Sequence, residues 1–531
     1  MTKNKIYFPL LLSIAVVLGI LIGSQLNYPR HKNVLLFNKN PQEEKIKRLI
    51  DYIQYDYVDQ VNTDSLLDGT IKQIISKLDP HSVYIPASEA TDIAERMNGE
   101  FVGIGVQFRV YKDTIAVVKV LENGPSRKAG IKAGDRILIA GKDTLFGKKL
   151  GNDFIMKTLK GKPKTTVNLT IYRKSENKTY TVLLKRGTVP IKSIDAYYMM
   201  NDSLGYIKVD RFAATTYDEF KVALDSLKRK NMEHLVLDLR GNPGGYLGVA
   251  TKMVDEFLED DKLIVFTKNK GGKIEKSFAS AKGDFEKGKV YVLIDENSAS
   301  ASEIVAGALQ DNDKGTIVGR RSFGKGLVQQ EMGLGDGSAV RLTVSRYYTP
   351  TGRSIQKPYH KNDSQAYFEG DGFEERLYSG ELLSADSIKV NDSLKYITPK
   401  GKTVYGGGGI IPDVFVGIDT TGYLETFHFR VMNNFVFDYV DNNRKELEKW
   451  TLPEFVKDFD KDDKILNEYL AIIKPDLKGE IDNIPYIKRY LSSLFAQFLF
   501  GDNEFYQVLN QNDKMLEKVK ELEYKVDYVK H

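Results

Sequence analysis

The sequence predicts a multidomain α/β protein in which helices at both ends flank a β-rich segment and an α/β core. Its 531 residues suggest about three or four domains, at roughly 150 residues per domain. Hydrophobic residues make up 41% and charged residues 28%, which is ordinary for a folded globular chain. Along the chain the apolar residues change from helical spacing to short alternating strands, then to strands followed by helices, and finally back to helical spacing.

The composition excludes several classes of protein. The chain has no cysteine, so disulfide scaffolds, cysteine-ligated zinc, iron–sulfur clusters and thiol proteases are ruled out. The net charge is +5 and the basic residues are scattered, which gives no support for nucleic-acid binding. The H-E-x-x-H motif of zinc metalloproteases is absent as well. We therefore expect a chemistry without metal or other cofactor.

The N-terminus predicts where the chain is located. Lys3 and Lys5 precede an apolar run at residues 6–22, which as a helix spans about 26 Å of a ~30 Å hydrocarbon core. Residues 1–25 are predicted to be a signal anchor that associates with the inner membrane. The alternative is a cleaved signal peptide, for which Ile22-Gly23-Ser24 is a poor cleavage site. Because the lysines stay in the cytoplasm, the body is expected on the extracytoplasmic, periplasmic side, anchored or released.

The next two domains differ in their hydrophobic period. Residues 41–98 begin with two predicted helices within 41–80, where apolar residues recur at three- and four-residue spacing and Pro80 ends the second helix. Residues 99–187 contain short alternating strands separated by Gly, Pro and Asn. We expect a small β-rich domain there.

The α/β core is predicted at residues 188–417. Apolar strands at 235–239 and 290–294 each lead into a loop of small residues and then a helical pattern. Within this core, residues 361–400 are polar and are expected to be an insertion or a mobile loop. Residues 420–531 are predicted to be a helical extension. Its aromatic residues are expected mainly in its core: Phe427, Phe429, Phe435, Phe437, Tyr439 and Trp450.

The loop after the second core strand contains three serines, Ser298, Ser300 and Ser302. A helix is predicted to begin near Ser300 or Ala301, and the N-terminus of a helix presents free N–H groups and a favourable dipole to developing negative charge. An attacking serine needs this environment, with the Ala301 N–H as one oxyanion donor. The alternative is ordinary helix capping by serine, with Glu303 complementing the helix dipole.

A serine nucleophile also needs a base. No G-x-S-x-G motif supports a histidine-based hydrolase triad. A lysine can replace histidine when burial lowers its pKa, and Lys325 lies between two glycines where it can approach another backbone closely. The alternative for any single lysine is a solvated surface charge. The spacing Gly319…Gly324-Lys325 also imitates a phosphate loop, but Gly326 stands where that loop needs Ser or Thr.

Several ordered motifs resemble the carboxyl-terminal processing peptidases, which are tail-specific serine proteases with a Ser/Lys dyad and an embedded PDZ domain. They are Leu78-Asp79-Pro80-His81-Ser82, Gly99 to Gly105, Gly124-Pro125-Ser126 with Ala129-Gly130-Ile131 and Gly134-Asp135, Leu237 to Arg240 with Gly244-Gly245, the Ser300 loop, Phe323 to Gly326, Thr349 to Arg353, and Gly409 to Asp413. Each is weak alone, and their common order from about residue 40 to 417 is specific.

The resemblance implies a fold and a set of site residues. The core at 188–417 would be a ClpP/crotonase-like α/β fold, and residues 99–187 a PDZ-like domain. Ser300 matches the nucleophile and Lys325 the general base. The remaining matches are Gln329 as support of the lysine, Ala301 with Gly244 or Gly245 as the oxyanion hole, Glu303 as an orienting residue, and Gly103, Ile104, Gly105 and Val106 as the loop that binds a substrate's terminal carboxylate.

The expected function is an ATP-independent serine endopeptidase that recognises exposed, apolar C-terminal tails and processes or degrades envelope proteins. The resemblance further implies dimerisation through the N-terminal helices. For Gly103 to Val106 the alternative is a simple turn in a small barrel. For the whole chain the alternative is an inactive PDZ adaptor or pseudoprotease at the membrane surface, which the joint presence of Ser300, Lys325 and Gln329 disfavours.

Overall fold

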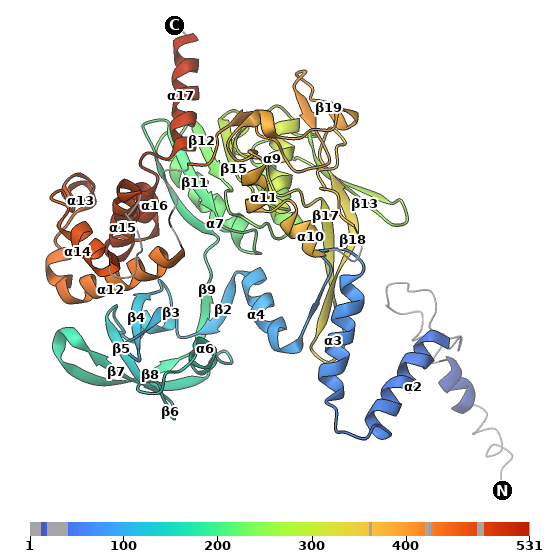
Figure 1. Ribbon diagram of the computed structural model, residues 1–531, viewed down its shortest axis with the longest axis horizontal. Coiled ribbons are helices and arrows are strands. Elements are labelled where there is room, and N and C mark those ends of the chain that lie inside the picture. Colours follow the sequence, from blue (N-terminus) through green and yellow to red (C-terminus); the bar gives the residue numbers. More distant parts are fainter. Residues whose placement is uncertain are drawn as a thin grey trace. The chain divides into compact units, whose positions relative to one another are not determined.

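The computed structural model describes residues 12–18, 41–360, 364–419, 424, 426–474 and 483–529 (Figure 1). The chain divides into two compact units, residues 1–71 and 72–531. Helices α2 (Pro41–Tyr55) and α3 (Thr63–Ser76) confirm the two predicted N-terminal helices. Of the predicted signal segment, residues 12–18 are helical and the rest lies outside the described residues. Within the described ranges, no helix has the length and apolar character that crossing a membrane requires.

A six-stranded sheet forms the centre of the α/β core. Its strand order is β10-β11-β12-β15-β16-β21, with β10 antiparallel to β11 and every other neighbouring pair parallel. The strands are β10 (Ile194–Met199), β11 (Leu204–Val209), β12 (His234–Asp238), β15 (Lys289–Ile294), β16 (Gly315–Gly319) and β21 (Val414–Phe415). Because the carboxyl ends of parallel strands share one edge, the loops after β12, β15 and β16 meet there.

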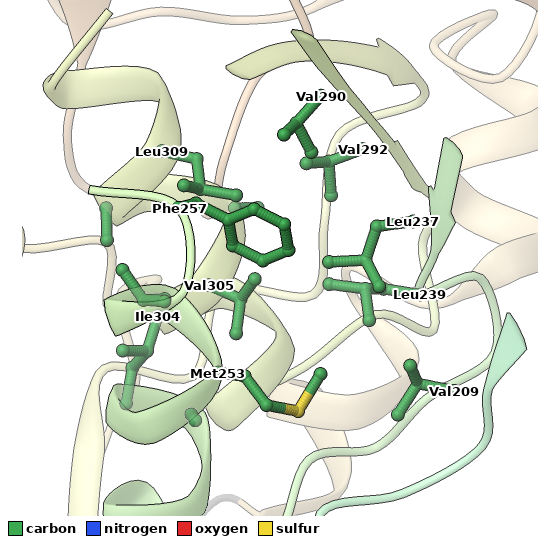
Figure 2. Close-up of a cluster of buried hydrophobic side chains, with 14 of the residues drawn as sticks. Val209, Leu237, Leu239, Met253, Phe257, Val290, Val292, Ile304, Val305 and Leu309 are labelled. Carbon is green, nitrogen blue, oxygen red and sulfur yellow. The ribbon is translucent and has the colours of Figure 1, made fainter. Parts of the chain in front are cut away.

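Helices cover both faces of this sheet, which explains its nearly continuous apolar strands. Side chains point alternately to the two faces. Leu237 and Val292 pack with α7 (Thr216–Lys228), α8 (Leu247–Asp255) and α9 (Ala301–Asp311). Figure 2 shows part of this core, from strand residues such as Leu237, Val290 and Val292 to Phe257, Val305 and Leu309. The alternate residues, such as Val236 and Leu293, pack against Met515, Leu516 and Val519 of α17 (Lys514–Val529).

A second, antiparallel sheet lies beside the core and carries one side of the candidate site. Strand β18 pairs with β1, β13 and β17, and β13 also pairs with β14. The strands are β1 (Val83–Ile85), β13 (Leu263–Asn269), β14 (Ile274–Phe278), β17 (Leu327–Gly333) and β18 (Ala339–Tyr348). Helix α4 (Ala87–Asn98) follows β1 and leads into the β-rich domain.

The predicted β-rich domain has its own sheet and its own core. Strands β3, β4, β5, β7 and β8 are consecutive neighbours, β6 pairs with β5, and β2 pairs separately with β9. Ile115, Val117, Ile137 and Leu169 are among its buried residues. The elements are β2 (Glu100–Gly103), β3 (Val106–Tyr111), β4 (Thr114–Val120), α5 (Pro125–Lys128), β5 (Asp135–Ala140), β6 (Asp143–Thr144), α6 (Asn152–Leu159), β7 (Thr166–Arg173), β8 (Lys178–Lys185) and β9 (Gly187–Pro190).

The polar segment at 361–400 is packed rather than a mobile loop in the part that the structure describes. Buried ion pairs explain this: Arg376 and Arg321 both contact the Glu381 carboxylate at 2.7 Å, and Leu382 is fully buried. The polar composition of this segment suggests a loop, but its charged side chains form ion pairs that attach the segment to the core. Its elements are α10 (Ser364–Glu369), α11 (Phe373–Tyr378), β19 (Lys395–Ile397) and, just beyond, β20 (Thr403–Tyr405).

The C-terminal extension is helical, as predicted. Its helices are α12 (Thr426–Leu447), α13 (Leu452–Asp458), α14 (Lys464–Ile473), α15 (Ile484–Leu499), α16 (Asp502–Leu509) and α17. Phe435 is buried in the core of the extension, and Phe427, Tyr439 and Trp450 pack against that core. Phe437 is buried as well, and its ring packs against Tyr111 of β3. Phe429 differs from the expectation because it remains 37% exposed.

Candidate active site

Ser300 lies in the loop between β15 and α9, where it is the N-cap residue of α9 and half-buried. Its backbone has φ 57° and ψ −112°, a region that a residue with a side chain rarely adopts. Holding a residue there costs on the order of 1–3 kcal/mol, and such strain tends to occur at functional sites. The conformation sets Ser300 apart from an ordinary N-cap residue, which has extended backbone angles.

The neighbouring serines are fixed in structural roles. Ser298 and Ser302 are fully buried. The Ser298 hydroxyl donates to the Leu239 carbonyl at 2.8 Å, and the Ser302 hydroxyl donates to the Asn242 carbonyl at 2.9 Å. These two bonds attach the loop after β12 to the N-terminus of α9. Of the three candidate nucleophiles, Ser300 is the one that is not fully buried.

Glu303 is a buried carboxylate that binds both loops of the candidate site. Its Oε2 accepts the backbone N–H groups of Ser300 and Lys325, each at 2.8 Å. Its Oε1 accepts the Gly324 N–H at 2.7 Å and the Ser322 hydroxyl at 2.5 Å. Burial raises the pKa of Glu303, and these hydrogen bonds oppose that rise. The carboxylate therefore does more than complement the helix dipole.

Lys325 lies between β16 and β17 and is half-buried. Burial lowers the pKa of its amine, and the nearby positive charge of Arg341 lowers it further, whereas Glu303 and Asp79 act in the opposite direction. The two flanking glycines are required because the backbone on either side of Lys325 has no room for a side chain. Gly324 has φ +91°, and a Cβ on Gly326 would lie 2.9 Å from the Gln356 nitrogen. The lysine is thus not a solvated surface charge.

Tyr347 of β18 provides a second connection between the two loops. Its hydroxyl is placed to donate to two carbonyl oxygens, that of Lys325 at 2.8 Å and that of Ser300 at 3.2 Å. The side chain is 1% exposed, and burial raises the pKa of the phenol well above its ordinary value. The hydroxyl consequently remains a donor at any ordinary pH.

Gln329 lies on β17, after a break in the regular pairing with β18 between Val328 and Gln329. Its amide nitrogen donates to the Thr343 hydroxyl at 3.4 Å. That hydroxyl also contacts Asp79, whose carboxylate accepts the Ser82 hydroxyl at 2.6 Å. The amide oxygen of Gln329 is thereby left to act as an acceptor.

The glycine loop after β12 packs directly against the Ser300 turn. A Cβ on Gly244 would lie 2.8 Å from the Ser300 Cβ and 2.9 Å from the Ala301 nitrogen. The Gly244 N–H donates to the Asn242 side chain at 2.8 Å. Among the described residues, the N–H groups of Gly245 and Ala301 have no hydrogen-bond acceptor. These two N–H groups remain available at the same edge of the sheet.

His81, Asp79 and Tyr347 are residues near the site to which sequence reasoning gave no role. His81 is mostly buried, and desolvation together with the charge of Lys325 lowers its pKa to about 4. Its Nε2 lies 2.9 Å from the Tyr367 hydroxyl of α10. The motif at 78–82 contains Asp79 and His81, but it does not indicate that they lie near Ser300 and Lys325. No local sequence pattern points to Tyr347. No group of acidic and histidine side chains suited to a metal occurs in the described ranges.

The predicted carboxylate-binding loop joins β2 to β3. Ile104 is 3% exposed and Gly105 has φ +79°. A Cβ on Gly105 would come within 3.1 Å of both Gly124 and Pro125, so only glycine fits this close approach. In the described part of the chain, the N–H groups of Ile104 and Gly105 donate to no other group.

Comparison with known families gives four matches. Residues 203–365 match peptidase family S41, and residues 102–184 match the PDZ domain. Residues 26–89 match the N-terminal domain of the activating protease CtpB. Residues 423–501 match a family of unknown function.

Individual relatives agree with these matches. The carboxy-terminal processing protease CtpB of Bacillus subtilis is 34% identical over 59% of this chain, which spans 65% of that relative's length. The carboxy-terminal-processing protease of Bartonella bacilliformis is 34% identical over 60% of this chain and 74% of its own length. A probable CtpA-like serine protease of Staphylococcus haemolyticus is 28% identical over 89% of this chain and 93% of its own.

These matches define a class first, the serine proteases that carry a PDZ domain. Within that class, the chain belongs to the carboxy-terminal processing proteases of peptidase family S41, which confirms the predicted resemblance. Among solved structures, the photosystem II D1 C-terminal processing protease aligns with 70% of this chain and 86% of its own at 23% identity, with a TM-score of 0.35.

Proposed function

We propose that the chain is an active endopeptidase in which Ser300 is the nucleophile and Lys325 the general base. The observation that carries this proposal is the network that holds the two residues together. The Glu303 carboxylate accepts a hydrogen bond from the backbone N–H of each residue, and the Tyr347 hydroxyl is within hydrogen-bond distance of the carbonyl oxygen of each. The partial exposure of Ser300 and the lowered pKa of Lys325 agree with these roles.

The reaction follows from these roles. The neutral Lys325 amine takes the Ser300 hydroxyl proton while the oxygen attacks the scissile carbonyl carbon. The resulting tetrahedral oxyanion collapses, the amide C–N bond breaks, and the lysine ammonium returns its proton to the leaving amine. A water molecule then gives a proton to Lys325, attacks the acyl-enzyme and releases the new carboxyl end, and Ser300 regains its proton. Water is the only co-substrate in these steps, and none of them uses ATP.

The oxyanion is proposed to accept hydrogen bonds from Ala301 and Gly245. Preorganised backbone donors in such positions are worth about 3–4 kcal/mol each. Gly244 is the less suitable of the two glycines, because its N–H already donates to Asn242. Its lack of a side chain instead lets the loop approach Ser300 and the Ala301 nitrogen.

Gln329 is proposed to orient the base. Its amide nitrogen donates to Thr343, so its amide oxygen is the group left to accept a hydrogen bond from the Lys325 amine. Asp79 and Ser82 hold Thr343 in turn, since the Ser82 hydroxyl contacts the Thr343 backbone N–H at 3.1 Å. The 78–82 motif thereby supports the lysine indirectly.

The PDZ domain is proposed to bind substrate tails. The loop from Gly103 to Val106 would hold the terminal carboxylate, and the free N–H groups of Ile104 and Gly105 supply donors for it. We infer that the substrates are envelope proteins with exposed apolar C-termini. The predicted signal segment and its two lysines support action at the periplasmic side of the inner membrane.

The test is digestion of a folded protein that carries an unstructured apolar tail, followed by intact-mass spectrometry without ATP or metal. The wild-type chain is expected to cleave it, and Ser300→Ala and Lys325→Met are expected not to. Lys314→Met is the matched control, because burial lowers the pKa of Lys314 too, but its amine contacts the Glu286 and Gly288 carbonyls outside the site. Equal cleavage by the wild type and Ser300→Ala would refute the proposed nucleophile. Tail binding without cleavage would favour the inactive PDZ adaptor.

A further inference from the structure

A large groove separates the PDZ domain from the C-terminal helical extension. Its volume is about 900 Å³, which is within the range of ligand-binding clefts. One wall consists of PDZ residues, among them Phe108 of β3 and Met156 of α6. The opposite wall consists mainly of residues 497–501, where α15 ends. Two segments that are far apart in sequence thus enclose one space.

The PDZ wall offers an open backbone edge. Strand β3 is the last strand of its sheet, and β4 is its pairing partner. Such an edge can accept an extended peptide as an additional strand. Because β3 begins at Val106, the last residue of the Gly103 to Val106 loop, a peptide on this edge would end at the proposed carboxylate donors.

The chemistry of the groove fits an apolar peptide with a free carboxylate. Both walls present apolar side chains: Val106, Phe108 and Met156 on the PDZ side, and Phe498, Leu499 and Phe500 on the other. Every charged residue that lines the groove is basic: Arg109, Lys119, Arg127 and Lys132. Lys119 and Lys132 are paired with Asp502 and Glu176, whereas Arg109 and Arg127 form no ion pair among the described residues. The charge of these two arginines complements the terminal carboxylate of a polypeptide.

Buried contacts fix α12, which lies beside the far wall, to the PDZ domain. The Arg136 guanidinium contacts Asp441 of α12 at 2.9 Å, with the two side chains only 9% and 6% exposed. Tyr111 packs against Phe437 with ring centroids 5.2 Å apart. Phe437 also packs against Phe498, with ring centroids 6.3 Å apart, so α12 holds residues 497–501 beside the PDZ domain.

Lys119 ties the end of β4 to the segment that follows the far wall. Its amine contacts the Asp502 carboxylate at 2.8 Å, and Gln497 donates to the same carboxylate at 3.0 Å. The position of the 497–501 turn is thus set by a charge on the PDZ domain itself.

We propose that residues 497–501 form the second wall of the substrate-tail site, so that an apolar C-terminal tail is clamped between β3 and the C-terminal extension. This inference rests on the proposed binding of tails by the PDZ domain and assigns a role to the extension. The extension then selects substrates, because the side chains near a tail's carboxyl end meet Phe498, Leu499 and Phe500 as well as the PDZ domain. An acidic side chain in this wall would repel the tail.

The first experiment measures binding of a fluorescein-labelled decapeptide ending in Leu-Val-Val with a free carboxylate. It uses the full chain with Ser300→Ala, so that binding is read without turnover. Leu499→Asp is expected to raise the Kd at least tenfold. Val456→Asp places the same charge at an exposed apolar residue of the same extension outside the groove, and is expected to stay within twofold. The amidated peptide is expected to bind more weakly than the free acid.

The second experiment does not depend on a groove variant folding. The penultimate peptide residue is replaced by benzoylphenylalanine, and the cross-linked sites in the Ser300→Ala chain are mapped by mass spectrometry. Cross-links to both β3 or α6 and residues 497–501 are expected. Cross-links to the PDZ wall alone, unchanged affinity of a folded Leu499→Asp chain, or no binding of the peptide at all would each overturn the inference. A chain that binds in this way without cleaving substrate would refute the proposed peptidase activity and leave the clamp standing.

Discussion

The N-termini of α9 and α13 share a local hydrogen-bond pattern and differ in their surroundings. At α9, the Glu303 carboxylate accepts the backbone N–H of Ser300 at 2.8 Å. At α13, the Glu454 carboxylate accepts the backbone N–H of Thr451 at 3.1 Å and its hydroxyl at 2.7 Å. Both follow the Ser/Thr-x-x-Glu pattern of a capping box.

The two carboxylates lie in opposite environments. Glu303 is fully buried, and burial raises its pKa even though donors from the Ser322 to Lys325 loop bind it. Glu454 is exposed, and its hydrogen bond with the Thr451 side chain lowers its pKa. The backbone differs as well: Thr451 has φ −92° and ψ 156°, the ordinary extended geometry of an N-cap, whereas Ser300 has φ 57° and ψ −112°.

A capping pattern becomes a site only through its tertiary partners. At α13 the pattern ends a loop and has no further contact with a catalytic group. At α9 the same pattern fixes the backbone of Ser300, because its carboxylate is shared with the Lys325 loop. Strain at Ser300 is sustained by that surrounding structure.

The largest expected effect separates activity from stability at these two caps. Ser300→Ala and Ser300→Gly are both expected to lower kcat by at least about 10⁴-fold, because both remove the proposed nucleophile. Glycine tolerates φ 57°, so Ser300→Gly is expected to be more stable than Ser300→Ala by about 1 kcal/mol. Thr451→Ala is expected to keep full activity and lose some stability.

Steady-state kinetics and urea unfolding of the four chains check this prediction. If Ser300→Gly is the less stable of the two Ser300 variants, the backbone there is not strained. If Thr451→Ala loses activity as well, the α13 cap is connected to catalysis and the comparison fails.

The second prediction concerns the two glutamates. Glu303→Gln replaces two acceptor oxygens by one oxygen and one donor, so some of the four N–H and O–H donors that Glu303 binds lose their acceptor. We expect a loss of about 2–3 kcal/mol in the free energy of unfolding and about 10²-fold in kcat/KM. Glu454→Gln should change neither by more than the experimental error, because its site is exposed.

Urea unfolding and kinetics at one pH test this pair of variants. The informative result is a kcat/KM that falls with little change in KM, since Glu303 touches the reacting loops and not the substrate. A Glu303→Gln chain with unchanged kcat would show that the carboxylate only stabilises the fold.

The third prediction uses neighbouring tyrosines of β18. Tyr347→Phe removes the hydroxyl that is hydrogen-bonded to the Ser300 and Lys325 carbonyl oxygens. We expect it to lower kcat about tenfold and the free energy of unfolding by about 1 kcal/mol. Tyr348→Phe is the matched control, because the Tyr348 ring stacks on Phe266 with centroids 4.9 Å apart, and it should retain both. Equal kcat for the two variants would contradict a positioning role for Tyr347.

The sequence predicted those parts of the molecule that adjacent residues encode. The strand, small-residue loop and helix around Ser300 are contiguous, as are the glycines around Lys325, and so both loops could be identified from local patterns. The polar composition of 361–400 suggested an insertion or a mobile loop, whereas Arg376 and Glu381 attach it to the core.

Contacts between distant residues were beyond the reach of such patterns. Tyr347 lies 47 residues from Ser300 in the chain, and Asp79 lies 264 residues from Thr343. Arg136 and Asp441, which join the PDZ domain to the C-terminal extension, are 305 residues apart. A single sequence gives the identity of each residue, but it does not show which distant strand or helix will pack beside that residue in the fold.

The smallest expected effect is a change of pH dependence. Burial and Arg341 both lower the pKa of Lys325, so kcat/KM of the wild type should rise with pH as the amine loses its proton below its ordinary pKa of about 10.5. Titration of His81 does not account for this rise, because a group with a pKa of about 4 is already neutral at the higher pH values where the Lys325 amine loses its proton. Arg341→Gln removes a positive charge near Lys325 and frees Glu331, its partner at 2.9 Å. Both changes favour the protonated amine.

We therefore expect the midpoint of the kcat/KM profile to move to higher pH in Arg341→Gln, with activity lowered near pH 7 and recovered at alkaline pH. Arg346→Gln is the control on the same strand, because Arg346 is exposed and is not among the charges that act on Lys325. A uniform loss of activity at every pH would mean that Arg341 supports only the structure of the sheet. A midpoint that stays in place or moves to lower pH would mean that the titrating group does not lie near Arg341 and is not the Lys325 amine, because removing a positive charge raises the pKa of every nearby group, acid or amine.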